Sequence, residues 1–318
     1  MKKLIIPFIV FGFVAAFLLI KHTQRKNSIY SIGILKTTSH SALDEAEKGF
    51  IEELKKLMHD DIGFIIKNGQ GSITSIHTIA QQFHSNKQID AFLAIATPAA
   101  QALSSVEKER PIIIAAVTDP ISLGLIHPKT NVCGTKDMID IKAQIEMLVQ
   151  LIPNAKTVGL LYTNTETNSL VSAQLMRDEL SRQGLIPLDF TVSNESDIPA
   201  VVELACRKSD VILAPNDNTI SSAITLVTSI INTRKKPFIV SDNMLVKFGA
   251  LAARGIDYKE SGKQAAEMAY SILVEGKKPY EIPMTMPHID TIYINAKTLA
   301  MLELVVPEAL KKDTIILV

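Results

Sequence analysis

Apolar positions in the first half of the chain follow two alternating patterns. Short runs of aliphatic and β-branched residues, such as Ile112–Val117, are typical of strands buried on both faces. Between these runs, apolar residues recur at helical spacing, as at Ala46, Phe50 and Leu54. The alternation predicts a parallel sheet covered by helices on both faces. Strands are expected at 29–35, 62–66, 91–96 and 112–117, and helices at 42–58, 72–83 and 98–106.

The same alternation restarts after residue 140 and predicts a second α/β unit of similar size. A late helix at 258–274 and a short C-terminal strand and helix complete the pattern. The only connection between the units is 131–140, which is not a long linker rich in Gly, Ser or Pro, so two closely coupled lobes are favoured over tandem domains. In this unit, strands are expected at 157–162, 188–192, 211–214 and 237–240, and helices at 141–151, 169–182, 198–206 and 219–233.

The N-terminus carries a targeting pattern. A basic start, Met1–Lys3, precedes a continuous apolar run at 4–20, which is typical of a secretory signal. The only candidate cleavage site, Val14–Ala16, lies inside that run, and no cysteine follows it for lipoprotein processing. A helix of this length would extend about 25 Å, close to the thickness of a bilayer core. We therefore predict that 4–20 stays attached as a membrane anchor, with a cleaved signal as the alternative.

Charge and motif content exclude several classes of function. Lys plus Arg and Asp plus Glu each number 33 in the 318 residues, so a neutral chain offers no electrostatic case for binding nucleic acid. The chain has no P-loop, no G-x-G-x-x-G, no G-x-S-x-G and no H-E-x-x-H. Cys133 and Cys206 fit no metal-ligand spacing, and we expect them to lie in different lobes without a bond between them. The sequence predicts no catalytic residues, no metal and no cofactor.

Polar side chains gather where expected strands end and expected helices begin. In open α/β sheets, ligands bind beyond the carboxyl ends of the strands, and helix N-termini there suit an anionic group. Two such edges facing each other would enclose a small zwitterion. The candidate ligand-binding residues are Lys36, Ser39, His40, Thr97, Thr118, Asp119, Glu166, Asn168, Ser169, Asp217, Asn218 and Asp242.

Each of these loops also has a purely structural interpretation. Thr97 followed by Pro98 is an ordinary helix start, Ser41 with Asp44 has capping-box spacing, and either Asp217 or Asn218 would cap the next helix. For a single residue the two interpretations are about evenly balanced. Six polar loops on the same edge of both units favour a cleft.

Several short motifs, in order, resemble one family. The segment that begins Ile32-Gly33-Ile34 and continues through His40 to Phe50 is similar to the opening of a family of ABC transporter substrate-binding proteins, which includes tryptophan- and tyrosine-binding members. The resemblance runs from about residue 29 to the C-terminus. Its further motifs are Ala94–Ala102, Val117–Pro120, Pro153–Gly159, Glu166 with Asn168-Ser169, Asp217–Thr219 and Gly255–Tyr258.

The resemblance implies a two-lobed type I periplasmic-binding-protein fold, α/β in class, whose chain crosses the hinge three times. It implies crossings near 132–136, 252–256 and 286–291, and packing of the 258–274 helix on the first lobe. The expected division is 1–27 as signal or anchor with a linker, 28–134 with 255–288 as the first lobe, and 135–254 with 289–318 as the second.

The resemblance also implies a function. We expect an exported receptor at the periplasmic or extracytoplasmic face of the membrane, which delivers a small-molecule ligand to an ABC permease and its ATPase. The expected ligand is an amino acid, with an aromatic one as an option. Its carboxylate would lie near Ser39–His40 and Thr97, and its ammonium near Asp217 or Asp119, with Glu166 and Asp242 as competing candidates. The family usually has glutamine at Lys36 and proline at Ser41, so these departures leave the ligand's identity open.

Three alternatives remain from the sequence. A membrane-tethered ligand sensor would use the same fold, and an uncleaved anchor would favour it. A hydrolase using Asp119 and His40 would need a nucleophile beside a base, which the sequence does not reveal. A transcription regulator would need a DNA-binding headpiece, whereas this chain begins with an apolar segment.

Overall fold

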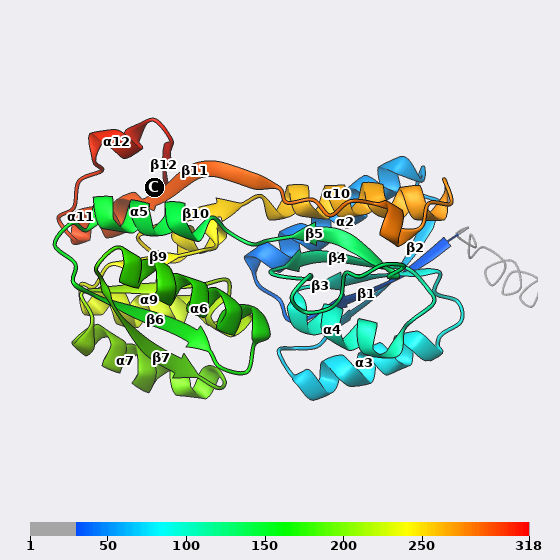
Figure 1. Cartoon of the computed structure of the whole chain (residues 1–318), viewed down its shortest axis with the longest axis horizontal. Coiled ribbons are helices and arrows are strands. Elements are labelled where there is room, and N and C mark those ends of the chain that lie inside the picture. The colour runs from blue at the N-terminus through cyan, green and yellow to red at the C-terminus, as the bar shows by residue number, and fades with distance from the viewer. Residues whose placement is uncertain (1–29, 318) are drawn as a thin grey trace, which may run out of the picture.

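A computed structural model describes residues 30–317 as two lobes, which lie side by side along the longest axis of the molecule (Figure 1). The predicted anchor at 4–20 lies outside these residues. Within 30–317, no helix is long and apolar enough to cross a membrane. The two-lobed α/β architecture predicted from the sequence is confirmed.

The first lobe is built on a five-stranded sheet in which every neighbouring pair is parallel, in the order β2-β1-β3-β4-β5. Every residue of β3 and β4 is buried, as expected for central strands with helices on both faces. The strands are β1 (Tyr30–Lys36), β2 (Ile62–Asn68), β3 (Ala91–Ile95), β4 (Ile112–Val117) and β5 (Val132–Lys136), and the helices are α2 (Ser41–Leu57), α3 (Ile73–Ser85), α4 (Thr97–Val106) and α10 (Tyr258–Leu273).

The second lobe is built on a seven-stranded sheet in the order β12-β11-β10-β9-β8-β6-β7. All neighbouring pairs are parallel except β10 with β11, so this sheet is mixed rather than purely parallel as expected. Its strands are β6 (Thr157–Thr163), β7 (Ile186–Val192), β8 (Val211–Ala214), β9 (Phe238–Val240), β10 (Ala252–Ile256), β11 (His288–Asn295) and β12 (Thr314–Leu317). Its helices are α5 (Ile141–Leu151), α6 (Thr167–Arg182), α7 (Ile198–Lys208), α8 (Asn218–Ser222), α9 (Ile224–Thr233), α11 (Ala296–Met301) and α12 (Glu308–Lys311), with the 3₁₀ helix η2 at Asn243–Phe248.

Two segments that lack an apolar run are nevertheless strands. β5 and β10 were expected only as connections between the lobes, because neither Val132–Lys136 nor Ala252–Ile256 is uniformly apolar. β5 completes the first sheet beside β4, and Thr135 also bridges to Thr285 on a returning connection. These segments are strands because they pair with neighbouring strands, although their own composition gives them little strand propensity. The single helix expected at 219–233 is divided at Ala223 into α8 and α9.

Glycines allow α2 and α10 to approach closely on the first lobe. A Cβ on Gly262 would lie 2.0 Å from the carbonyl oxygen of Ala46, and one on Gly49 would lie 2.1 Å from that of Lys259. This contact fixes the start of α10, where Tyr258 faces the space between the lobes. Elsewhere in the fold, Cys133 and Cys206 are both free, and they are buried in different hydrophobic clusters.

Candidate functional site

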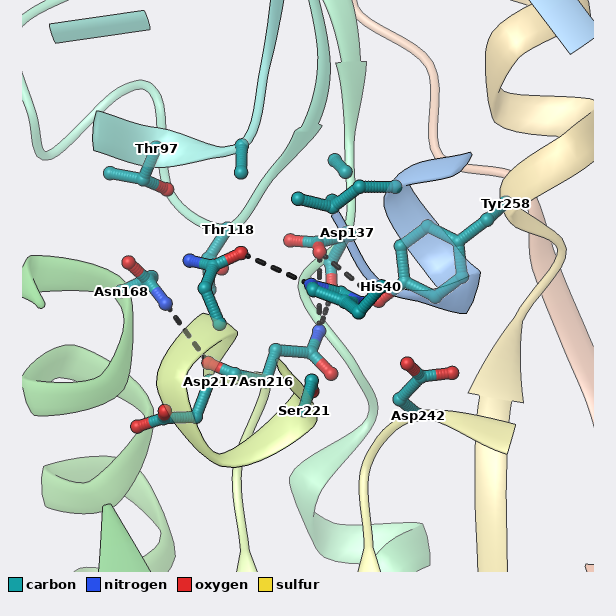
Figure 2. A pocket seen from close by; sticks show the side chains of 14 residues that line it. His40, Thr97, Thr118, Asp137, Asn168, Asn216, Asp217, Ser221, Asp242 and Tyr258 are labelled. Atoms are coloured by element: carbon teal, nitrogen blue, oxygen red, sulfur yellow. Dashed lines mark hydrogen bonds between the residues drawn. The ribbon is translucent and has the colours of Figure 1, made fainter. Parts of the chain in front are cut away.

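A cavity lies between the lobes, at the ends of strands from both sheets. Its free volume in this structure is only about 20 Å³, so the two lobes lie close together around it. Figure 2 shows the fourteen side chains that line it. They are His40, Leu43, Ala96, Thr97, Ala116, Thr118, Asp137, Asn168, Asn216, Asp217, Asn218, Ser221, Asp242 and Tyr258.

The cavity wall is assembled from strand ends and helix starts. Thr97 begins α4 directly after β3, and Thr118 follows β4. Asp242 follows β9 and caps η2, with its Oδ1 accepting from the N–H of Met244 at 2.8 Å. This is the edge at which ligands are expected in an open α/β sheet. The predicted residues that line the cavity are His40, Thr97, Thr118, Asn168, Asp217, Asn218 and Asp242.

Lys36 does not line the cavity, although its charge was expected at the cleft. Its Nζ lies 2.6 Å from Asp44 Oδ1 and 2.7 Å from Glu47 Oε2, both on α2. Burial alone would lower the pKa of Lys36, but these two partners raise it above its ordinary value. The charge is therefore neutralised within the first lobe.

Two more expected residues lie away from the cavity. Ser39 is exposed and accepts a hydrogen bond from Asn68 Nδ2 at 2.8 Å. Asp119 caps a local turn, with its Oδ1 accepting from the N–H of Ser122 at 3.1 Å. Neither position supports the contact with the ligand that was expected of it.

Glu166 acts as an internal anion at the start of α8. Its Oε2 accepts from the N–H of Asn218 at 3.0 Å, and its Oε1 accepts from the N–H of Thr219 at 2.9 Å. These N–H groups are the free donors of a helix N-terminus, where a carboxylate is stabilised. The start of α8 is therefore already occupied by a side chain of the protein.

Asp217 lines the cavity, but its carboxylate is committed to the fold. Oδ1 accepts from Ile220 N–H and from Thr163 Oγ1, both at 2.8 Å. Oδ2 accepts from Thr163 N–H at 2.6 Å and from Ser169 Oγ at 2.8 Å. Burial, and then the charge of Glu166, raises the pKa of Asp217 above its ordinary range. The geometry favours the capping interpretation over an ammonium contact, and it assigns Ser169 to the same structural cluster.

Asp137, Asn216 and Tyr258 line the cavity and were not among the candidates. Asp137 follows β5, in the segment expected only as a hinge connection, and its N–H donates to Val117 O of the first sheet. Its Oδ2 accepts from Tyr258 Oη and from Asn216 Nδ2, both at 3.3 Å. The signal available in the sequence was weak: an acid after a strand that has no apolar run.

Six buried polar atoms around the cavity have no hydrogen-bond partner within residues 30–317. Buried polar groups are nearly always paired, so a cluster of exceptions on one cavity needs an explanation. In Figure 2, Thr97 and Asn168 lie on one side of the cavity, and Tyr258 and Asp242 on the other. The six atoms are His40 Nδ1, Thr97 Oγ1, Asp137 Oδ1, Asn168 Oδ1, Asn216 Oδ1 and Asp242 Oδ2.

Five of these six atoms are acceptors. The carboxylate and amide oxygens accept by nature, and only the Thr97 hydroxyl can also donate. Asn218 Nδ2 donates to Glu166 Oε2 at 2.6 Å, so Asn218 Oδ1 faces His40 Nε2, 3.4 Å away. Nε2 must then carry the proton, which leaves Nδ1 of the neutral ring as an acceptor. The cavity is thus prepared for a ligand rich in donors.

Burial sets the protonation of the groups around the cavity. Desolvation raises the pKa of Asp137 to about 6, against the opposing effect of the Thr118 and Tyr258 hydroxyls, and desolvation together with the charge of Asp137 raises the pKa of Asp242 to about 7. Desolvation lowers the pKa of His40 to about 4, so the ring is neutral at pH 7. No Lys or Arg lines this cavity, and no group of His, Cys, Asp or Glu in 30–317 could hold a metal ion. The two acids therefore have no positively charged partner on the cavity wall, and a ligand with a positive charge would complement them.

Comparisons with known proteins identify the family of this chain. A family model described as ABC transporter substrate binding protein matches residues 31–315. The tyrosine-binding protein of Clostridioides difficile is 36% identical over 281 residues, which cover 86% of this chain and 81% of that protein.

Two solved structures differ in how well they superpose, although their sequence identities are nearly equal. An ABC domain from Streptococcus pneumonia in complex with L-Trp is 32% identical, with a TM-score of 0.87. The ligand-free, open structure of a substrate-binding protein with adhesive properties from Clostridium difficile is 31% identical, with a TM-score of 0.68. Each alignment covers 91% of this chain and 99% of the other. The match over nearly the whole described chain shows that the protein belongs to the family of ABC transporter substrate-binding proteins.

Proposed function

We propose that the protein is the receptor of an ABC importer and that it binds a free amino acid in the cavity by closing its hinge. The observation that carries this proposal is the set of six unpaired polar atoms, which are dominated by acceptors. An α-amino acid supplies three donors on its ammonium group, and an aromatic side chain such as that of tyrosine or tryptophan supplies one more.

The two ends of an amino acid have distinct complements in the cavity. Asp137 and Asp242 suit the ammonium group, because each has one oxygen held by the protein and one left unpaired. At the N-terminus of α4, Thr37 Oγ1 accepts from the N–H of Ala99 at 3.2 Å, and Thr97 Oγ1 beside it is free. A carboxylate is stabilised at such a helix start. The opposite side, with Asn168 Oδ1, would accept from a ring hydroxyl or ring N–H.

Hinge closure is supported by how the lobes meet in this structure. Across the cleft, Thr38 Oγ1 lies 3.4 Å from Ser222 Oγ, and His40 Nε2 lies 3.4 Å from Asn218 Oδ1. The higher TM-score against the L-Trp complex than against the open form is consistent with a closed arrangement of the lobes. A ligand that bridges both lobes shifts an open–closed equilibrium toward the closed form. The closed receptor would then dock, outside the cytoplasm, on a permease that its own ATPase drives.

A thermal-shift screen of the purified full chain tests this proposal. The twenty amino acids are compared with sugars, polyamines and inorganic anions at equal concentration. We expect L-tyrosine or L-tryptophan to raise the melting temperature, because a ligand that binds only the folded state stabilises it. Stabilisation by another chemical class, with no response to any amino acid, would contradict the proposal.

A further inference from the structure

Three of the side chains that line the cavity each carry a buried oxygen without a partner among the described residues. Asp137, Asn216 and Asp242 are 4%, 9% and 3% exposed, so none of the three side chains can be satisfied by bulk water. Each has one polar atom fixed by the protein and one acceptor oxygen without a partner among the described residues. A buried polar group with an unpaired acceptor costs free energy unless a further donor bonds to it.

The fixed atoms hold these three side chains in place. Tyr258 Oη and Asn216 Nδ2 each donate to Asp137 Oδ2 at 3.3 Å, which leaves Oδ1. Asn216 Nδ2 also donates to the carbonyl oxygen of Asp137 at 3.1 Å, which leaves Asn216 Oδ1 as an acceptor. Met244 N–H holds Asp242 Oδ1 at 2.8 Å, which leaves Oδ2.

From this geometry we infer that Asp137 Oδ1, Asn216 Oδ1 and Asp242 Oδ2 form a subsite for one primary ammonium group, with one acceptor for each of its three N–H donors. This inference deepens the proposed function and rests on it. It specifies that the ligand carries an –NH₃⁺ group rather than a substituted amine, and that two carboxylates share the charge. It replaces Asp217 and Asp119 as the expected partners and keeps Asp242, which was a competing candidate from the sequence.

The subsite takes its parts from both sides of the cleft. Asp137 is tied to the first sheet through its N–H bond to Val117 O, at 3.2 Å. Asn216 and Asp242 follow β8 and β9 of the second sheet. Closure therefore brings two carboxylates toward each other in a dry space where like charges repel. A bound ammonium group would remove that repulsion and so stabilise the closed state.

Counting donors gives the test. The full chain is titrated by calorimetry with L-tyrosine and L-tryptophan, and with their N-methyl, N,N,N-trimethyl and des-amino analogues. Each N-methyl group removes one donor, so we expect the N-methyl amino acid to bind at least tenfold more weakly than its parent. The trimethyl and des-amino compounds should bind at least a hundredfold more weakly.

Variants then assign the effect to the three oxygens. Asp137→Asn and Asp242→Asn keep the shape and each should lose at least tenfold in affinity for the amino acid, whereas Asp119→Asn, at a half-buried acid that does not line the cavity, should lose none. In the double variant, the preference for the amino acid over its des-amino analogue should nearly disappear. An unchanged preference in the double variant would overturn the subsite and leave the proposed function intact. Failure of the unmodified protein to bind any amino acid would overturn both.

Discussion

At the scale of single residues, the sequence located the polar loops but could not say which atom in a loop is free. Asp217 and Asn216 are adjacent after β8, yet Asp217 is fully used by donors while Asn216 keeps a free oxygen. The donors to Asp217 include Thr163, which is 54 positions away in sequence. Only the folded chain brings that donor into place, so the roles of neighbouring residues could not be separated beforehand.

The capping role of Asp217 leads to a prediction about stability. Asp217→Ala leaves buried donors without an acceptor and removes a helix cap, so the free energy of unfolding should fall by about 2–4 kcal/mol. Urea unfolding of the ligand-free protein measures this. Asp119→Ala, which removes one exposed turn contact, should change it by less than about 0.5 kcal/mol. Equal stability of the two variants would show that the Asp217 network contributes little.

At the scale of elements, most helices and buried strands follow directly from apolar periodicity. β3 and β4 were expected because they are apolar throughout, and α2 because its apolar residues repeat at helical spacing. β5 and β10 were missed as strands because pairing with neighbours, rather than their own composition, makes them strands. Asp137 was missed for the same reason, since it follows a strand that was not expected.

The close contact between α2 and α10 depends on glycine, and this dependence can be tested by substitution. In a helix without such a contact, Gly→Ala stabilises by about 1 kcal/mol. At Gly262 the new Cβ would lie 2.0 Å from Ala46 O, so we expect Gly262→Ala to destabilise by about 1–3 kcal/mol instead.

Because α10 begins at Tyr258 on the cavity wall, this change should also weaken amino-acid binding. Thermal melting and calorimetry of the variant measure both effects. The exposed change Glu267→Ala, on the same helix, is the control and should alter neither. A stabilised Gly262→Ala protein would refute the close approach of the two helices.

At the scale of the whole molecule, the equilibrium between open and closed lobes should depend on pH as well as on ligand. In the closed form, desolvation raises the pKa of Asp137 to about 6 and of Asp242 to about 7, whereas separated lobes would leave these acids hydrated near their ordinary values. The closed form therefore binds more protons than the open form between about pH 4 and 7. Lowering the pH through this window should favour closure without ligand.

The other charged groups near these acids either oppose this effect or do not change it. His40, whose pKa is lowered to about 4 by burial, binds fewer protons when closed, so it partly offsets the two acids below pH 6.5. Asp217 and Glu166 accept hydrogen bonds from Thr163 and Asn218, which belong to the same lobe. Closure of the hinge leaves these contacts unchanged. Lys247 lies near Asp242, and Tyr258, whose pKa is raised well above its ordinary value, stays neutral.

Spin labels across the mouth of the cleft can report this pH dependence. Ile73 and Ser196 are exposed residues that line a second cavity, of about 340 Å³, where the cleft opens. Labels at Ile73→Cys and Ser196→Cys should show a growing short-distance population as the pH falls from 8 to 5 without ligand. In the Asp137→Asn, Asp242→Asn background this growth should vanish. Growth that persists in that background would assign the pH response to other groups.

The same label pair at pH 8 provides the most direct test of the central claim, that the lobes close around an amino acid. Without ligand, the distribution of distances between the labels should be dominated by a long, open component. Saturating L-tyrosine or L-tryptophan should convert it to the short distance expected from this structure, with a midpoint that matches the calorimetric affinity. A distribution that does not change while calorimetry shows the amino acid to be bound would contradict the account.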